Sequence, residues 1–162
     1  MKHMQTGSFQ HHPLMRRTIA YTCLFVAGLW VTNLAMFFMR MSLSPASIAA
    51  YYRGSEADYL PARSAASMLE ASHAHLAMMA LVMLVMTHLA IFAPYSDKAK
   101  RRIIAWGFGS ALVEEGSGWL VRFVHPGFAW LKAVSFIAFQ AILAFLIATL
   151  AIFLWHASRE EA

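Results

Sequence analysis

Four long apolar segments divide the chain, and polar or turn-forming residues separate them. Each segment is long enough for a helix that crosses a bilayer, which takes about 20 residues. Pro94 ends the second segment, and His125-Pro126-Gly127 predicts a tight turn between the third and the fourth. The pattern predicts an all-α fold, an integral membrane four-helix bundle that forms one domain over residues 1–162. The predicted spans are residues 18–39, 67–93, 103–124 and 131–155.

The polar segment 41–66, between the first two spans, contains signals for a short helix. Ser44 is a good N-cap, Pro45 fits the first helical position, and Gly54 fits the position after the last turn. These residues predict a helix over residues 46–53. It either caps the bundle and covers a site, or lies at the membrane interface without a ligand. Three tyrosines suit an interfacial position: Tyr51, Tyr52 and Tyr59.

The composition agrees with a membrane protein. The chain has 162 residues, of which 60% are hydrophobic and 13% are charged, whereas soluble domains have about 25% charged residues. The net charge is +5, but the basic residues flank the spans, which indicates membrane topology and excludes nucleic-acid binding. The single cysteine, Cys23, excludes an intramolecular disulfide and a cysteine metal cluster.

The distribution of lysine and arginine predicts the orientation of the spans, because cytoplasmic loops are richer in these residues. Both termini and the loop at residues 98–102 are predicted to be cytoplasmic in the inner membrane of a bacterium, and segments 41–66 and 125–130 periplasmic. Eight basic residues flank the spans on the cytoplasmic side: Lys2, Arg16, Arg17, Lys98, Lys100, Arg101, Arg102 and Arg159. Five lie on the other side: Arg40, Arg53, Arg63, Arg122 and Lys132.

The second span carries four ionisable side chains, which are costly inside a membrane and usually functional. At 100° per residue they fall on two faces. One face contains Glu70, His73, Ala77, Leu84 and His88. The opposite face contains Met68, His75, Met79, Met83 and Met86, a stripe that suits copper(I) transfer or ordinary packing.

His73 and His88 are 15 residues apart, which is about 22 Å along a helix. This spacing predicts axial ligands for one or two haem b groups. His125 on the periplasmic side and His156 or His12 on the cytoplasmic side are the candidate partner ligands, unless a homo-oligomer completes each site. His75 is a further candidate ligand. Alternatively, the histidines form hydrogen bonds between helices.

Glu114 and Glu115 lie near the middle of the third span, where two ionised carboxylates would be expensive. We expect them to be protonated, or paired with His73 or another polar group. They are candidates for a proton relay or for hydrogen bonding to a quinone. Arg122 lies at the predicted depth of Glu70 and suits a pair with that residue or a clamp on a haem propionate.

Three motifs resemble a group of small bacterial four-helix inner-membrane proteins that is cytochrome-b-like. They are Ser44-Pro45 with Ile48-Ala49 and Tyr51-Tyr52-Arg53-Gly54, Leu69-Glu70-Ala71-Ser72-His73-Ala74-His75-Leu76, and Thr87-His88-Leu89. The group shares an E-x-x-H-x-H helix start and occurs alongside c-type cytochromes. The resemblance covers about residues 18–155. It implies a respiratory setting and marks Glu70, His73, His75 and His88 as positions of interest.

These features predict a haem b-binding electron-transfer subunit that links the quinol pool to a periplasmic acceptor. It would contact membrane lipid and other membrane or periplasmic redox proteins, and it would be a non-catalytic subunit of an oxidoreductase complex. Two alternatives stay open, which are a cofactor-free structural or assembly subunit of a respiratory complex and a metal or proton transporter.

Overall fold

Five α-helices and one short 3₁₀ helix make up the part of the chain that the computed structural model describes, residues 12–159, with side chains described to residue 155. Four of the helices are long: α2 (Pro13–Arg40), α4 (Ala65–Ala90), α5 (Asp97–Phe123) and α6 (Ala129–Arg159). The short helix α3 (Pro45–Arg53) lies between α2 and α4, and η2 (Pro126–Phe128) precedes α6. No β-strand occurs within residues 12–159, so the all-α prediction is confirmed.

Serine caps set the starts of three helices. The hydroxyl groups of Ser44, Ser64 and Ser96 accept hydrogen bonds from backbone N–H groups in the first turns of α3, α4 and α5. The predicted short helix is therefore confirmed almost to the residue. The third long helix begins six residues before the predicted membrane span at residue 103, because Ser96 caps it and the charged residues that follow are good helix formers.

Three of the described helical segments are long and apolar enough to cross a membrane. They are Pro13–Arg40, Ala65–Ala90 and Pro126–Trp155, the last of which joins η2 to α6. Helix α5 has a similar length but carries a charged first turn and two glutamates, and it is not one of these three.

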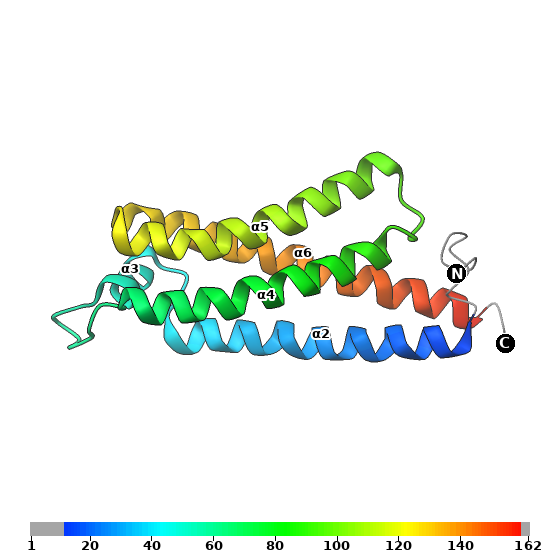
Figure 1. The fold of residues 1–162 in the computed structure, drawn as a ribbon, viewed down its shortest axis with the longest axis horizontal. Helices are drawn as coiled ribbons and strands as arrows, with labels where there is room; N and C mark the ends of the chain where they lie inside the picture. The colour runs from blue at the N-terminus through cyan, green and yellow to red at the C-terminus, as the bar shows by residue number, and fades with distance from the viewer. Residues whose placement is uncertain (1–11, 160–162) are drawn as a thin grey trace.

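Helix α6 holds the bundle together, because it contacts α2, α3, α4 and α5. Helices α4 and α5 also pack against each other, and α3 lies across α5 and α6 at one end (Figure 1). We call this end the α3 end. The first residue of α2 and the last residues of α6 lie at the opposite end, which we call the terminal end (Figure 1).

Two apolar clusters fill the interior. The larger one extends toward the terminal end and is centred on Met83, Met86, Leu146 and Leu150, which are all fully buried. The smaller one lies under α3, where the rings of Phe37 and Phe136 stack with their centroids 3.8 Å apart. Between the clusters the interior is more polar, and a pocket opens there.

Candidate functional site

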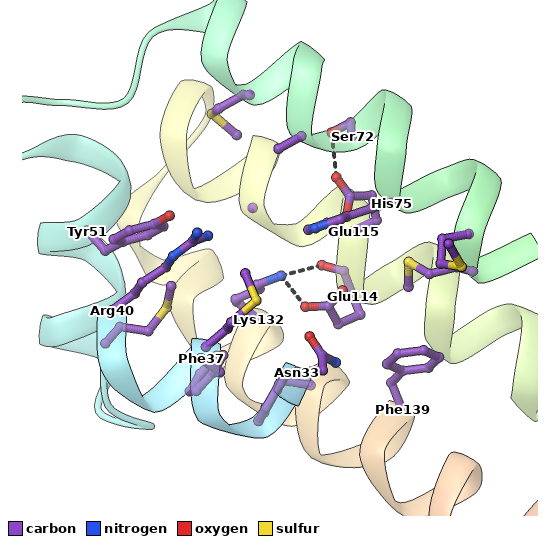
Figure 2. A pocket seen from close by; sticks show the side chains of 18 of the residues that line it. Asn33, Phe37, Arg40, Tyr51, Ser72, His75, Glu114, Glu115, Lys132 and Phe139 are labelled. Atoms are coloured by element: carbon purple, nitrogen blue, oxygen red, sulfur yellow. Dashed lines mark hydrogen bonds and ion pairs between the residues drawn. The ribbon is translucent and has the colours of Figure 1, made fainter. Parts of the chain in front are cut away.

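A pocket of about 240 Å³ lies among the four long helices near the α3 end, with α3 at its edge (Figure 2). Its walls combine apolar side chains such as Phe139 and Leu143 with a cluster of polar ones. The exposed residues of its lining come mainly from two helices, with Leu29 and Met36 on α2 and His75 and Met78 on α4. The pocket therefore opens sideways between α2 and α4.

A hydrogen-bonded network on one wall joins α4 to α5. The Ser72 hydroxyl donates to Glu115 Oε1, and Trp119 Nε1 donates to the Ser72 hydroxyl at 2.8 Å. His75 Nδ1 lies 3.1 Å from the other carboxylate oxygen of Glu115. The His75 side chain is 53% exposed and that of Glu115 is 12% exposed, so the pair runs from the interior to the pocket opening.

The second glutamate forms a separate buried pair with Lys132 of α6. Lys132 Nζ donates to Glu114 Oε1 and, at 2.8 Å, to the Glu114 backbone carbonyl (Figure 2). The side chains of Lys132 and Glu114 are 7% and 13% exposed. Glu114 and Glu115 are neighbours in the sequence, but each carboxylate has its own partner, which is Lys132 for Glu114 and His75 for Glu115. The two glutamates are therefore not two unpaired buried charges.

Helix α3 covers the glutamate pairs at this end of the bundle. Lys132 Nζ lies 6.0 Å from the centre of the Tyr52 ring. A Cβ atom at Gly118 would lie 2.8 Å from the Tyr52 hydroxyl, so only glycine lets this tyrosine approach α5 so closely. Burial raises the pKa of the Tyr52 phenol above its ordinary value, and the group stays a neutral hydrogen-bonding hydroxyl at physiological pH.

Arg53 and Arg122 form hydrogen bonds that hold the segment around α3 against α5. Arg53 donates to the backbone carbonyls of Val121 and Arg122 near the end of α5. Arg122 Nε donates to the Arg63 carbonyl at 2.7 Å. Arg122 thus anchors the backbone of the loop before α4, and its predicted role as a propionate clamp stays a prediction.

The remaining predicted site residues lie away from the pocket. Glu70, His73 and His88 are exposed on the outer face of α4, and none of them lines the pocket. His125 is exposed in the turn before η2, where its Nδ1 accepts a hydrogen bond from the Gly127 backbone N–H. The side chain of His156 lies outside the described part of the chain.

The division of α4 into two faces is confirmed, because Met68, His75 and Met79 line the pocket and Glu70, His73 and His88 do not. The glutamates were expected to pair with His73 or another polar group, and the structure shows the second alternative, since His75 and Lys132 contact them. Within residues 12–155, no group of three or more histidine, cysteine, aspartate or glutamate side chains is arranged to hold a metal ion.

Sequence reasoning missed Ser72, Trp119, Tyr52 and Lys132 as site residues. A signal was present for Lys132, which lies 18 positions after Glu114 across a short turn. Two opposite charges at this spacing meet when consecutive helices are antiparallel. The positive charge of this lysine was counted only for membrane topology.

A family model described as a transmembrane helical domain matches residues 42–161, which begin before α3 and end one residue before the last residue of the chain. No curated protein matches the chain, and no solved structure matches it.

Proposed function

We propose that this chain, which belongs to the Aq_1264_TM family of transmembrane helical domains, binds a quinol in its pocket and accepts protons from it. Helix α5 would be a fourth membrane span beside α2, α4 and α6. The termini would face the cytoplasm of a bacterium and α3 the periplasm. This topology is supported by the excess of basic residues near the terminal end.

The observation that carries this proposal is the Glu115–His75 pair at the opening of a pocket with largely apolar walls. A lipid-soluble molecule in the bilayer reaches such a pocket between α2 and α4 without crossing water. Its ring would lie against apolar side chains such as Met79 and Phe139, and its hydroxyl groups would face the polar wall. Pockets of this kind use a few placed polar groups to orient an apolar ligand.

His75 and Glu115 would accept the protons that quinol oxidation releases. Oxidation of a quinol to a quinone releases two protons and two electrons. His75 is half-exposed and Glu115 lies largely buried behind it, so the two quinol protons pass to this pair one after the other, and the half-exposed imidazole releases the first before the second is taken. Ser72 and Trp119 hold the carboxylate in place. A redox partner would take the electrons, and we propose a periplasmic acceptor protein for this role, with His73 and His88 as the residues that would hold a haem b.

Haem binding is a second proposal, supported by the outer face of α4. His73 and His88 are exposed on the same face, one toward each end of the helix. Ionisable side chains in a span rarely face lipid, so this face suits a cofactor or a partner chain. A haem held there by His73 or His88 would supply one-electron transfer, and a second copy of this chain would complete the site.

Quinol binding is tested by titrating the protein in lipid nanodiscs with a short-chain quinol, using isothermal calorimetry. Glu115→Gln should weaken binding about tenfold, since a hydrogen bond to a charged group is replaced by a neutral one. Glu70→Gln is the matched control on the outer face of α4 and should bind like the wild type. Equal affinity for Glu115→Gln and the wild type would contradict the proposal.

Haem binding is tested by a reduced-minus-oxidised absorption spectrum of the purified protein, together with a pyridine haemochrome assay. The proposal expects a haem b signal that His73→Ala or His88→Ala removes. A colourless protein would refute the haem proposal and leave the quinol titration as an independent result.

A further inference from the structure

Two arginines line the pocket at the α3 end. Arg40 lies in the last turn of α2, and Arg63 lies in the loop just before α4. Figure 2 shows Arg40 beside Tyr51, at the edge of the pocket away from Phe139. The guanidinium of Arg63 lies 5.5 Å from the centre of the Tyr51 ring. The tyrosine thus has one arginine against its ring and another beside it.

Arg63 is held in position although its segment has no regular secondary structure. Its backbone N–H donates to the Tyr52 carbonyl at 3.1 Å, and its carbonyl accepts from Arg122 Nε at 2.7 Å. Gly54, with φ of 86°, makes the turn that starts this segment, and a Cβ there would lie 2.7 Å from the Leu60 carbonyl oxygen. The backbone that carries this cation is therefore fixed, which reduces the entropy lost when a ligand binds.

The two arginines have no acidic partner among the described residues. The ion pairs in that part of the chain are His75–Glu115 and Lys132–Glu114. Of the acidic residues in the loop before α4, Asp58 accepts a hydrogen bond from the Ser55 hydroxyl, and Glu56 is exposed without an ion pair. The pocket edge therefore carries two positive charges that the described part of the chain leaves uncompensated.

We propose that Arg40 and Arg63 form a binding site for the phosphate of an anionic phospholipid at the edge of the pocket. Guanidinium groups bind phosphate through paired, charge-assisted hydrogen bonds. A lipid is favoured over a free phosphate ion because the site adjoins apolar residues of the pocket wall. Met36 of α2 is 44% exposed beside this edge, and the acyl chains pass it on the way into the bilayer.

This site is separate from the Glu115–His75 pair and does not depend on the quinol proposal. The lipid phosphate is held at the α3 end, whereas the quinol hydroxyl groups face the wall formed by Ser72 and Glu115. Glu115→Gln should therefore weaken quinol binding and keep the preference for anionic lipid. Arg40→Gln should remove that preference, which is measured without quinol present, so failure of one proposal does not affect the other.

The experiment is native mass spectrometry of the detergent-solubilised full chain titrated with phosphatidylglycerol, phosphatidylcholine or inorganic phosphate. We expect phosphatidylglycerol to bind about tenfold more tightly than phosphatidylcholine, the difference that one charge-assisted interaction supplies. Arg40→Gln and Arg63→Gln should each abolish this preference. Arg40→Lys and Arg63→Lys keep the charge and should retain part of it, and the melting temperature of each variant shows that it is folded.

Arg17→Gln is the matched control, because Arg17 is an exposed arginine of the same helix at the terminal end. It should leave the lipid preference unchanged. If phosphatidylglycerol and phosphatidylcholine bound equally, the proposal would be wrong. It would also be wrong if Arg17→Gln lost the lipid preference as much as Arg40→Gln, because the lipid would then bind non-specifically around the helices. If millimolar inorganic phosphate displaced phosphatidylglycerol, the site would bind free phosphate, and the proposal of a lipid ligand would be wrong.

Discussion

The α3 end and the terminal end of the bundle are held together by different interactions. Near the α3 end, polar pairs join the helices, with Lys132 of α6 bound to Glu114 and His75 of α4 bound to Glu115. Toward the terminal end, the contacts are mainly apolar and centre on Met83 and Leu146, with one polar contact between Tyr95 and Thr149.

The difference matters because lipid chains are as apolar as leucine, so apolar packing alone gives helices little preference for one another over lipid. Polar pairs are directional and leave a buried charge exposed to hydrocarbon when they break. The polar half therefore fixes which helix faces are opposed, and the apolar half fills the space between them. The pocket lies in the polar half, so the groups that we propose to bind a quinol and accept its protons also hold the helices together.

The largest effect is expected from breaking the buried ion pair. Lys132→Met leaves the Glu114 carboxylate without a partner and should lower the free energy of unfolding by about 3–5 kcal/mol. Unfolding in bicelles, followed by steric trapping, measures this change. The double variant Glu114→Gln with Lys132→Met should recover most of the loss. If the single variant is as stable as the wild type, the pair does not hold the polar half together.

A smaller loss is expected in the apolar half. Leu146 is fully buried, and Leu146→Ala should cost about 2–4 kcal/mol because it leaves a cavity between α6 and its neighbours. The same unfolding assay applies. Leu84→Ala is the control, since Leu84 is 58% exposed on α4, and it should change stability by less than about 0.5 kcal/mol. Equal losses in both would mean that this core is not tightly packed.

Two glycines on α5 give a closely matched test of the contact between α3 and α5. Gly118→Ala places a methyl group against Tyr52 and should cost about 1–3 kcal/mol. A Cβ atom at Gly116 would meet no neighbouring atom within 4 Å, so Gly116→Ala should stabilise the helix by about 0.5–1 kcal/mol. Thermal unfolding in detergent compares the two. Similar melting temperatures would contradict the position of Tyr52.

The smallest changes in stability are expected from histidine substitutions on the two faces of α4. His75→Ala removes the hydrogen bond to Glu115 and should lower stability by about 1 kcal/mol. His73→Ala removes an exposed side chain and should change stability by less than about 0.5 kcal/mol in the isolated chain. Parallel melting curves measure both. A larger loss for His73→Ala would show that its face is covered in the purified protein.

Much of the local structure could be predicted from the sequence. Run length and turn residues predicted the long helices, and Ser44, Pro45 and Gly54 predicted α3, because caps and hydrophobic periodicity act over a few neighbouring residues. The predicted span at residues 103–124 leaves out the first turns of α5, because the basic residues after Ser96 resemble a loop in composition although they belong to the helix.

The site was predicted only in part. Glu114, Glu115 and His75 were identified as residues of interest, and the structure brings Glu115 and His75 together. Lys132 and Ser72 were not identified, because their partners lie on other helices, and Arg40 and Arg63 were counted only for topology.

The sequence by itself determined that the chain is a helical membrane protein and that α4 has a methionine face with His75 and an opposite face with Glu70, His73 and His88. These properties follow from composition and from the 100° turn of each residue, which are local. Only the tertiary structure decided which face points inward, since that depends on the rotation of whole helices. Contacts between residues 40 and 18 positions apart set that rotation, and they bring His75 to Glu115 and Lys132 to Glu114.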